Sequence, residues 1–427
     1  YDDSHIGHAR SLYIFDVIRR YLKYRGFEVK FVRNITDIDD KIINRANELK
    51  VDWKELVKKY IERYYEDLKS LGIEKGDFEP RATENIPEMI KYIQGLIEKG
   101  FAYEAGGDVY FNVRKFSSYG KLSGQSIDAM ETGVRIEPTE HKKDPLDFAL
   151  WKKSKENEPF WDSPWGKGRP GWHIECSVMS QKYLKTDTLD IHAGGRDLIF
   201  PHHENEIAQS EALSGKPFAK YWMHGGLLTI NSQKMAKSLG NFVTIKDFMN
   251  KYKYADLLKL FFLSAHYSSP IDYTAEKIEE TKQALERILI LLNKVEENPV
   301  SNKIKEIEDV KDNFIKAMDD DFNTPQALAC IFELVNLANK NIGNADFTSV
   351  AKNTLKELLN LLGLKLNFDQ NEDTADETKL IQDLIDKRIQ LKKEKQYSEA
   401  DKVREDLEEK GIILEDTKDG TTWRRKL

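Results

Sequence analysis

The sequence predicts an α/β protein that ends in an α-helical bundle and a small C-terminal domain. Three observations support this fold class. An amphipathic pattern at residues 9–24 is followed by an alternating apolar pattern at 27–32, and a helix followed by a strand is typical of a βαβ unit. Strand patterns of a parallel sheet return at 188–192 and 221–230. From about residue 275 onward nearly every segment follows a helical pattern, which predicts a bundle.

Composition sets the protein class. The 427 residues are 40% hydrophobic and 33% charged, which supports real cores and excludes a wholly disordered chain. No run reaches the roughly 18 apolar residues of a membrane span, so we expect a soluble protein with no membrane partner. The net charge of −7 argues against a strongly basic nucleic-acid binder but permits a local basic groove. Two cysteines fit a reducing, cytoplasmic compartment, and the absence of coiled-coil heptads predicts a monomer.

The N-terminal elements follow in order. Gly26 is placed to end the first helix, and residues 27–32 then predict a strand with one apolar face. The first strand of such a βαβ unit would precede Tyr1. Residues 39–71 form a second helical region, and a helix at 86–99 is closed by Gly100.

The remaining boundaries come from shifts in pattern. We expect the first part of a catalytic domain at 1–102, a β-rich connective insertion at 103–168, the second part of the catalytic domain at 169–274, a helical bundle at 275–364, an acidic linker, and a C-terminal domain at 378–427. The C-terminal domain should contain one long charged helix, a turn and a hairpin-like end.

The segment His5-Ile-Gly-His8 stands directly before the first predicted helix. A helix N-terminus offers free backbone N–H groups and a partial positive charge, which suit an anion. Gly7 lets a flat base or a phosphate approach the backbone closely. His5 and His8 can donate hydrogen bonds to phosphate oxygens as charge builds in a transition state. Taken alone, the pattern is equally typical of two surface histidines near a helix start.

The segment Lys234-Met-Ala-Lys-Ser238 places two lysines three residues apart. Such a loop can clamp a triphosphate, although a lysine-rich loop alone is usually a solvated surface. Together with the histidine motif it resembles the two signatures of class I aminoacyl-tRNA synthetases, with Ala236 where the usual lysine signature has Ser. We therefore expect ATP to be bound by His5, Gly7, His8 and Lys237, and catalysis to depend on His5, His8, Lys234 and Lys237.

A third set of residues has the spacing of metal ligands. Segment 171–176 ends in Cys176, and Pro201 suits the first turn of a helix. His202 and Glu206 at i and i+4 would then project from one helix face. With a thiolate from a neighbouring helix they form a typical ligand set for Zn²⁺. Cys176 alone also fits a buried core thiol, and the His–Glu pair alone fits a surface helix, but the two segments together favour a metal site.

At this point the sequence resembles the cysteinyl-tRNA synthetase family. The matching segments cover 1–10, 33–41, 168–176, 190–209, 234–241, 321–328 and 420–426. The resemblance implies a Rossmann-type class I synthetase catalytic domain with a small β-rich insertion. In the family, zinc is held by two Cys, one His and one Glu. Cys176, His202 and Glu206 match three of these ligands, and the fourth would be a Cys four residues before Tyr1.

The resemblance also implies an activity. It implies ATP-dependent ligation of L-cysteine to tRNA(Cys) through a cysteinyl-adenylate, with one Zn²⁺ per chain selecting the substrate thiolate and Mg²⁺ accompanying ATP. A metal–sulfur bond separates cysteine from serine better than an apolar pocket, which discriminates by only about 1–3 kcal/mol per group. By position, Thr36, Trp172 and His192 should line the amino-acid pocket.

The C-terminal residues suit RNA. Trp423 beside Arg424 and Arg425 combines a stacking surface with cations, as recognition of single-stranded RNA loops requires. The resemblance implies an anticodon-binding element here. The alternative is a cysteine ligase with an amino-sugar acceptor, which would not need this tail. A nucleotidyltransferase would not explain the metal ligands, and a non-catalytic relative would not be expected to keep the histidines and lysines.

Overall fold

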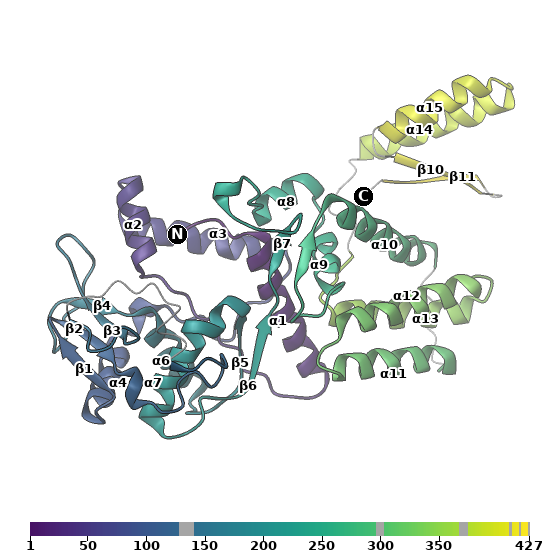
Figure 1. The fold of residues 1–427 in the computed structure, drawn as a ribbon. Coiled ribbons are helices and arrows are strands. Elements are labelled where there is room, and N and C mark those ends of the chain that lie inside the picture. Colours follow the sequence, from purple (N-terminus) through teal and green to yellow (C-terminus); the bar gives the residue numbers. More distant parts are fainter. Residues whose placement is uncertain (128–140, 296–302, 367–374, 410–411, 418–419, 426–427) are drawn as a thin grey trace.

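The computed structural model describes residues 1–127, 141–295, 303–366, 375–409, 412–417 and 420–425. Figure 1 shows the β-rich insertion at one end and the helical bundle at the other. Between them lie the parallel strands β5 (Leu189–Gly195) and β6 (Ala219–Gly225), beside helix α1 (Ile6–Tyr24). The helices and strands together form an α/β protein with a helical C-terminal region, so the predicted fold class is confirmed by the arrangement of its elements.

Helix α1, Ile6–Tyr24, is the central helix of the molecule. Its N-cap is His5, whose ring accepts a hydrogen bond from the backbone N–H of His8. After Arg25 the chain turns at Gly26, where φ is +87°, a conformation that glycine adopts without steric cost. The helix thus begins three residues earlier than predicted and ends where predicted.

The prediction of a strand at 27–32 is wrong, because these residues do not pair continuously with another strand. Val32 and Ile35 make only isolated parallel bridges with Phe78 and Arg81. Phe27 is 62% exposed, so the alternating apolar face does not pack into a core. Alternation shows that one face can be buried, but a ladder also needs partners along the whole segment, and here the bridges lie at one end only.

The helical region at 39–71 forms two helices. The break falls at Lys50, which has left-handed φ of 55°, and Asp52 caps the next helix by accepting from the backbone N–H of Lys54 and Glu55. The bounds are α2 Asp40–Leu49, α3 Trp53–Ser70, a 3-10 turn at Ala82–Glu84, and α4 Ile86–Glu98. Gly100 follows α4 with φ of +74°, as predicted for a helix stop.

The β-rich insertion is a four-stranded antiparallel sheet in the order β1-β2-β3-β4. Its strands are β1 Ala102–Ala105, β2 Asp108–Phe111, β3 Phe148–Lys153 and β4 Gly168–Pro170, with a 3-10 turn at Val113–Lys115. Phe111 and Trp151 are fully buried and share a core with α4 and helix α6, Trp172–Leu184. This shared core attaches the insertion to the helix that carries Cys176.

The predicted parallel strands are present. Strand β5, Leu189–Gly195, pairs in parallel with β6, Ala219–Gly225. A 3-10 turn, a kinked π-helical segment and an α-helix connect them, at Arg196–Leu198, Ile199–His203 and α7 Glu204–Ser214. A second sheet follows in the order β8-β7-β9, with strands Gln233–Lys234, Leu228–Ile230 and Ile271–Tyr273. A 3-10 turn at Lys237–Leu239 and helices α8 Ile245–Tyr252 and α9 Ala255–Leu263 lie between β8 and β9.

The helical bundle packs directly on the α/β part of the molecule. Its helices are α10 Ala275–Lys294, α11 Lys305–Asp319, α12 Thr324–Lys340 and α13 Ala345–Leu361. They share one hydrophobic core with α1 and α9. Tyr13 of α1 donates to the carbonyl of Leu362 at 2.5 Å, and Tyr21 donates to Asp319 at 2.7 Å. The bundle therefore fixes the far side of the helix whose N-terminus carries the histidine motif.

The C-terminal residues have a core of their own. Ile385, Val403 and Leu407 pack against the hairpin residue Leu414. The elements are α14 Ala375–Lys393, α15 Tyr397–Glu409, β10 Ile412–Thr417 and β11 Gly420–Arg425. The single long helix predicted here is wrong, because the chain reverses at Lys395, which has φ of 63°. A reversal lets the two helices and the hairpin bury their apolar faces against each other.

Within the described residues, none of the helices has the length and apolar character that crossing a membrane would require.

Candidate active site and metal centre

The predicted site residues gather around one cavity of about 1390 Å³. It lies between the start of α1, the segment 27–34 and the strands β5 and β6. Six predicted residues line it: His5, Gly7, His8, Cys176, His192 and Lys234. The structure thus brings one proposed metal ligand and both phosphate motifs to one space, although they lie as much as 229 positions apart in the sequence.

The histidine motif is joined by backbone hydrogen bonds to the segment that follows the lysine loop. The N–H of Ile6 donates to the carbonyl of Val243 at 3.0 Å, and the N–H of Ile245 donates to the carbonyl of Ser4 at 2.9 Å. A Cβ built on Gly7 would meet the His5 ring at 3.0 Å and the Met235 methyl at 3.3 Å. A side chain at this position would therefore crowd the His5 ring and the Met235 side chain.

Arg10 fixes the same end of α1 from behind. Its side chain is buried, and its guanidinium donates to four backbone carbonyls, those of Gly226, Leu227, His266 and Ser269. These carbonyls belong to the corner between β6 and β7 and to the turn before β9. The histidine motif is thereby held beside two parallel strand pairs, β5 with β6 and β7 with β9. Arg10 was not singled out from the sequence, because an arginine in the first turns of a helix is not a distinctive pattern.

The two lysines of the loop are exposed to solvent. Asn241 shapes the loop, because its side chain accepts from the N–H of Ala236 at 2.9 Å and donates to the carbonyl of Lys234 at 3.1 Å. Lys237 forms an ion pair with Asp2. Burial by itself raises the pKa of Asp2, but Lys237 lowers it below its ordinary value. Lys237 is therefore held by a carboxylate, and it is not among the residues that line the cavity.

The two histidines of the motif differ in their exposure. Burial lowers the pKa of His5, whose side chain is half-buried, whereas the His8 side chain is exposed to solvent. The His8 ring is stacked on Tyr64, with ring centroids 6.3 Å apart. A neutral imidazole keeps one N–H donor, so both rings can still donate to a phosphate oxygen.

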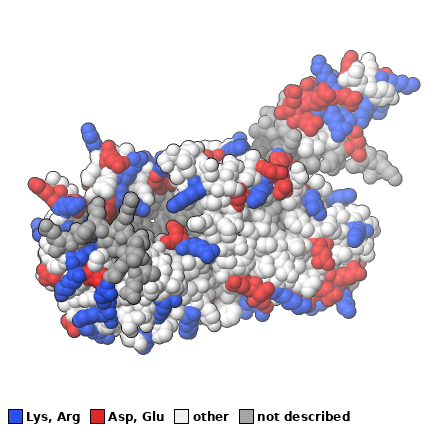
Figure 2. Space-filling model, in the orientation of Figure 1, with Lys and Arg blue, Asp and Glu red and all other residues white. Residues whose placement is uncertain are grey.

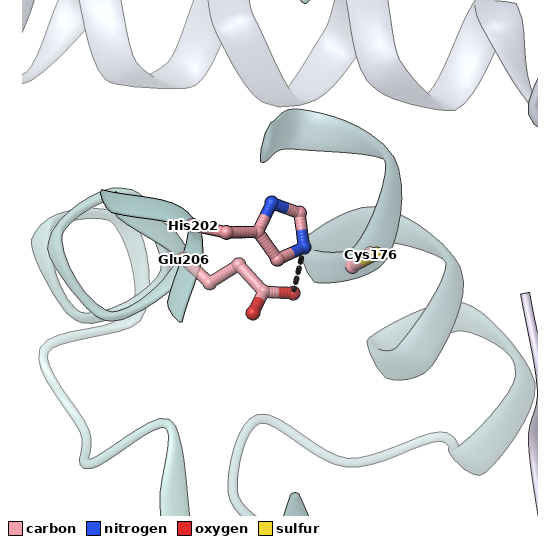
Figure 3. A group of neighbouring side chains, drawn as sticks. All are labelled: Cys176, His202 and Glu206. Atoms are coloured by element: carbon pink, nitrogen blue, oxygen red, sulfur yellow. Dashed lines mark ion pairs between the residues drawn. The ribbon is translucent and has the colours of Figure 1, made fainter. Parts of the chain in front are cut away.

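The predicted metal ligands meet as a compact group (Figure 3). Cys176 comes from α6, Glu206 from α7, and His202 from the π-helical segment that precedes α7. Pro201 lies in that segment and not, as predicted, in the first turn of the helix. One ligand atom from each lies within 4.8 Å of the other two, and His202 Nε2 is 3.8 Å from Glu206 Oε1. Within the part of the chain that is described, the buried Oε1 of Glu206 has no hydrogen-bond partner. An unpartnered buried carboxylate oxygen facing a thiol and an imidazole fits a zinc ion.

The electrostatics of this group also suit a cation. Burial raises the pKa of Glu206 by itself, but His192, His202 and His203 together lower it to about 2. Burial raises the pKa of the Cys176 thiol well above its ordinary value. A bound divalent ion offsets that cost, because a coordinating thiol is deprotonated outright.

Sequence reasoning missed two histidines beside the centre. The other carboxylate oxygen of Glu206, Oε2, lies 2.9 Å from His192 Nε2 and 3.9 Å from His203 Nε2. His203 Nδ1 is in turn 2.8 Å from His224 Nε2 on β6. The sequence could have pointed to His203, since it directly follows the predicted ligand His202. The sequence could not have pointed to His224, because only the parallel pairing of β5 with β6 brings it beside the metal group.

Two residues predicted for the amino-acid pocket lie beside the metal group rather than in the cavity wall. Thr36 donates at 2.8 Å to the buried carboxylate of Glu175, the neighbour of Cys176. Trp172 is 40% exposed and stacks on the His202 ring with centroids 4.2 Å apart. His192 lines the cavity and also contacts Glu206.

The predicted RNA-binding residues lie on the last strand. Trp423 pairs with Leu414 and packs against the C-terminal core. The backbones of Arg424 and Arg425 pair with Ile413 and Ile412 in the hairpin, but their side chains lie outside the described atoms.

Comparison with known proteins decides the family. Residues 1–283 match the family described as "tRNA synthetases class I (C) catalytic domain", and residues 313–367 match the DALR domain. The cysteine–tRNA ligase of Persephonella marina is 50% identical, covering 100% of this chain and 93% of its own length. That of Aquifex aeolicus is 48% identical with the same coverage. The chain belongs to the cysteine–tRNA ligase family.

Solved structures show the same fold in other class I synthetases. A methionyl-tRNA synthetase of Mycobacterium tuberculosis bound by methionyl-adenylate has a TM-score of 0.62 at 13% identity, covering 84% of this chain and 89% of that one. A leucyl enzyme of Agrobacterium radiobacter has a TM-score of 0.63 at 11% identity, covering 85% and 82%. These likenesses support the fold only. The predicted Rossmann-type class I fold and the enzyme class, a cysteine–tRNA ligase, are thereby confirmed.

Proposed function

We propose that this synthetase activates L-cysteine with ATP to cysteinyl-adenylate and then transfers the cysteinyl group to tRNA(Cys), with zinc selecting the substrate thiolate. The observation that carries the proposal is the shared cavity: Cys176 of the metal group and the motif His5–His8 line the same space. An amino acid held by its sulfur at one end can thus present its carboxylate to a nucleotide at the other.

On the phosphate side, His5, Gly7, His8 and Lys237 bind ATP, and His5, His8, Lys234 and Lys237 stabilise charge on its phosphates. Gly7 keeps the backbone open to the nucleotide, the imidazoles donate hydrogen bonds, and the ammonium groups act as point charges. Mg²⁺ accompanies the ATP. No covalent enzyme intermediate is needed, because positioning and electrostatic stabilisation suffice for an in-line attack of the carboxylate on the α-phosphate. The new carboxyl–phosphate bond replaces the bond between the α- and β-phosphates, and pyrophosphate leaves.

On the amino-acid side, Cys176, His202 and Glu206 hold one zinc ion. When bound, zinc lowers the pKa of a substrate thiol and gains a strong bond to sulfur, which a serine hydroxyl does not offer. Trp172 and His192 touch the ligands themselves, and Thr36 bonds to the neighbour of Cys176. We assign these three residues to positioning the amino acid beside the metal group.

The C-terminal domain binds the tRNA, with Trp423, Arg424 and Arg425 as contact residues. On the face shown in Figure 2, Lys and Arg side chains of the described residues are interspersed with Asp and Glu side chains, including on the projecting C-terminal part. Contact with RNA through this domain therefore depends on particular side chains and stacking rather than on a broad basic field. We further propose that the enzyme is a cytoplasmic monomer, which light scattering of the purified protein tests.

The decisive experiment is cysteine-dependent exchange between ATP and pyrophosphate by zinc-loaded protein. Exchange with cysteine and at least a hundredfold less with serine is expected, since selection depends on the sulfur. Absence of exchange, or equal exchange with both amino acids, would refute the proposal. Supplying tRNA in one reaction and an amino sugar in another, and following the consumption of cysteine, then identifies the acceptor. Consumption with the amino sugar alone would establish the alternative ligase.

A further inference from the structure

The metal ligand His202 has a hydrogen-bond partner on the side away from the metal group. Its Nδ1 lies 2.9 Å from the Nδ1 of His173, whereas its Nε2 faces Glu206. Two ring nitrogens at this distance need one proton between them, so one donates and the other accepts. If His202 is to offer a lone pair to a metal through Nε2, its proton must reside on Nδ1. His173 Nδ1 is then the acceptor.

His173 is itself held rigidly. The side-chain amide of the buried Gln209 donates to the backbone carbonyl of His173 and, at 2.7 Å, to Ser177 Oγ. Gln209 stands on α7, three residues after Glu206, so it ties the helix of one ligand to the helix of another. The edge of Phe148 from β3 packs against the His173 ring with centroids 5.6 Å apart.

The neighbouring side chain completes the arrangement. Trp172 stacks on the His202 ring at an interplanar angle of 24°. Two consecutive residues at the start of α6 thus restrain His202 in different ways. Trp172 restrains the plane of the ring, and His173 restrains its rotation and the location of its proton.

We propose that His173 is a positioning residue for the metal site: by accepting the Nδ1 proton of His202 it fixes the tautomer and orientation in which Nε2 can bind the metal. The inference rests on the proposed function, because it assumes that Cys176, His202 and Glu206 hold the ion. It assigns His173 no contact with the metal or the substrate. Loss of such an outer hydrogen bond commonly weakens metal binding 10–100-fold.

The competing role for His173 is simple packing between Phe148 and His202. A matched pair of substitutions separates the two roles. Asn and Leu have the same number of side-chain heavy atoms and the same branching, but the Oδ1 of Asn stands near the position of His Nδ1 and accepts a hydrogen bond, whereas Leu has a methyl group there.

The experiment measures zinc affinity by competition with a chromophoric chelator, without ATP, cysteine or tRNA, and the ligand-field spectrum of the Co²⁺ form. His173→Leu is expected to bind zinc about 10–100-fold more weakly with an altered Co²⁺ spectrum. His173→Asn is expected to recover most of the affinity and the wild-type spectrum. Phe148→Leu, which removes packing but no hydrogen bond, should leave the affinity within a few-fold of wild type.

Two results would overturn the proposal: wild-type zinc affinity in His173→Leu, or equal losses in the Leu and Asn variants. If the Leu variant does not fold, His173→Gln replaces it, because the amide of Gln is one carbon further out and cannot reach the same position. Zinc binding by the Gln variant as tight as that by the Asn variant would again contradict the proposal.

Cys176→Ser is measured in parallel. If it keeps stoichiometric zinc, the metal assignment itself fails, and that outcome is distinct from a failure of His173 alone.

Discussion

The two ends of the active site are built differently. At the metal end, Cys176, His202 and Glu206 are enclosed, and a set of side chains bonds to the ligands from outside. At the phosphate end, the lysines are exposed and the segments are joined by backbone hydrogen bonds, with a carboxylate paired to Lys237. A preorganised buried site suits an ion that stays bound. Flexible ammonium groups on the surface suit a large anion that must bind and dissociate.

The difference predicts that substitutions at the two ends change different measurements. At the metal end, binding of the ion and of cysteine should fall together. At the phosphate end, the rate of adenylate formation should fall while cysteine binding persists. The following predictions, from the largest effect to the smallest, test that separation.

Cys176→Ser should have the largest effect. Serine cannot supply a thiolate, so zinc affinity should fall by more than the roughly 100-fold that loss of an outer contact costs, and cysteine affinity should fall with it. Metal analysis and cysteine binding measure the two losses. Cys330→Ser, at the other cysteine and within the helical bundle, is the control and should retain zinc. Stoichiometric zinc in Cys176→Ser would contradict the ligand assignment.

Lys237→Ala should slow adenylate formation by about 100-fold, because it removes an ammonium that acts on the phosphates in the transition state. Cysteine affinity and zinc content should stay at wild-type values. Single-turnover kinetics and cysteine titration check the two quantities. Equal losses in rate and cysteine binding would mean that the loop has a structural role and that the two ends are not separable.

Asp67 tests whether a half-buried carboxyl with a raised pKa occurs at the phosphate end. It lies on α3, where burial raises its pKa from 3.8 to about 6 despite a hydrogen bond from Ser4. The folded protein thus binds this proton more tightly than the unfolded chain, and the associated stability is lost as the pH rises from about 4 through 6. Asp67→Asn should therefore raise Tm relative to wild type above pH 6 and less so near pH 4. Exposed Glu62→Gln on the same helix should not change this dependence.

Asp2→Asn should have the smallest effect. Removing the carboxylate frees Lys237 from its ion pair, so the KM for ATP should fall by at most a few-fold, as expected for an exposed pair. Asp3→Asn is the matched control, because Asp3 pairs with Arg63 instead. A KM for ATP that rises in Asp2→Asn, or falls equally in both variants, would show that this ion pair does not hold the lysine back.

Much of the site was predictable because its signals are local. The i, i+4 spacing of His202 and Glu206, the placement of His5–His8 before a helix and the two lysines of the loop all depend on neighbours in the chain. The helix stops at Gly26 and Gly100 are equally local, since glycine alone adopts their φ values freely. Strands of a parallel sheet were also predicted at 188–192 and 221–230, and β5 and β6 are present there and pair in parallel.

The predictions that were wrong concern structure that depends on residues far apart in the sequence. Residues 27–32 have strand alternation, yet they form only isolated bridges, because a ladder needs a neighbour along its whole length. The tail helix reverses at Lys395, where burial of two apolar faces against one hairpin outweighs continued helix propensity.

The sequence by itself determined which chemical groups this protein carries and which of them share a helix or a loop, because those relations extend over a few residues. Only the tertiary structure decided which side chains stand behind the ligands. His173 reaches His202, and His224 reaches His203, across elements whose separation in space bears no relation to their separation in sequence. Hydrogen bonds act over about 3 Å, so their partners are fixed by packing and not by spacing along the chain.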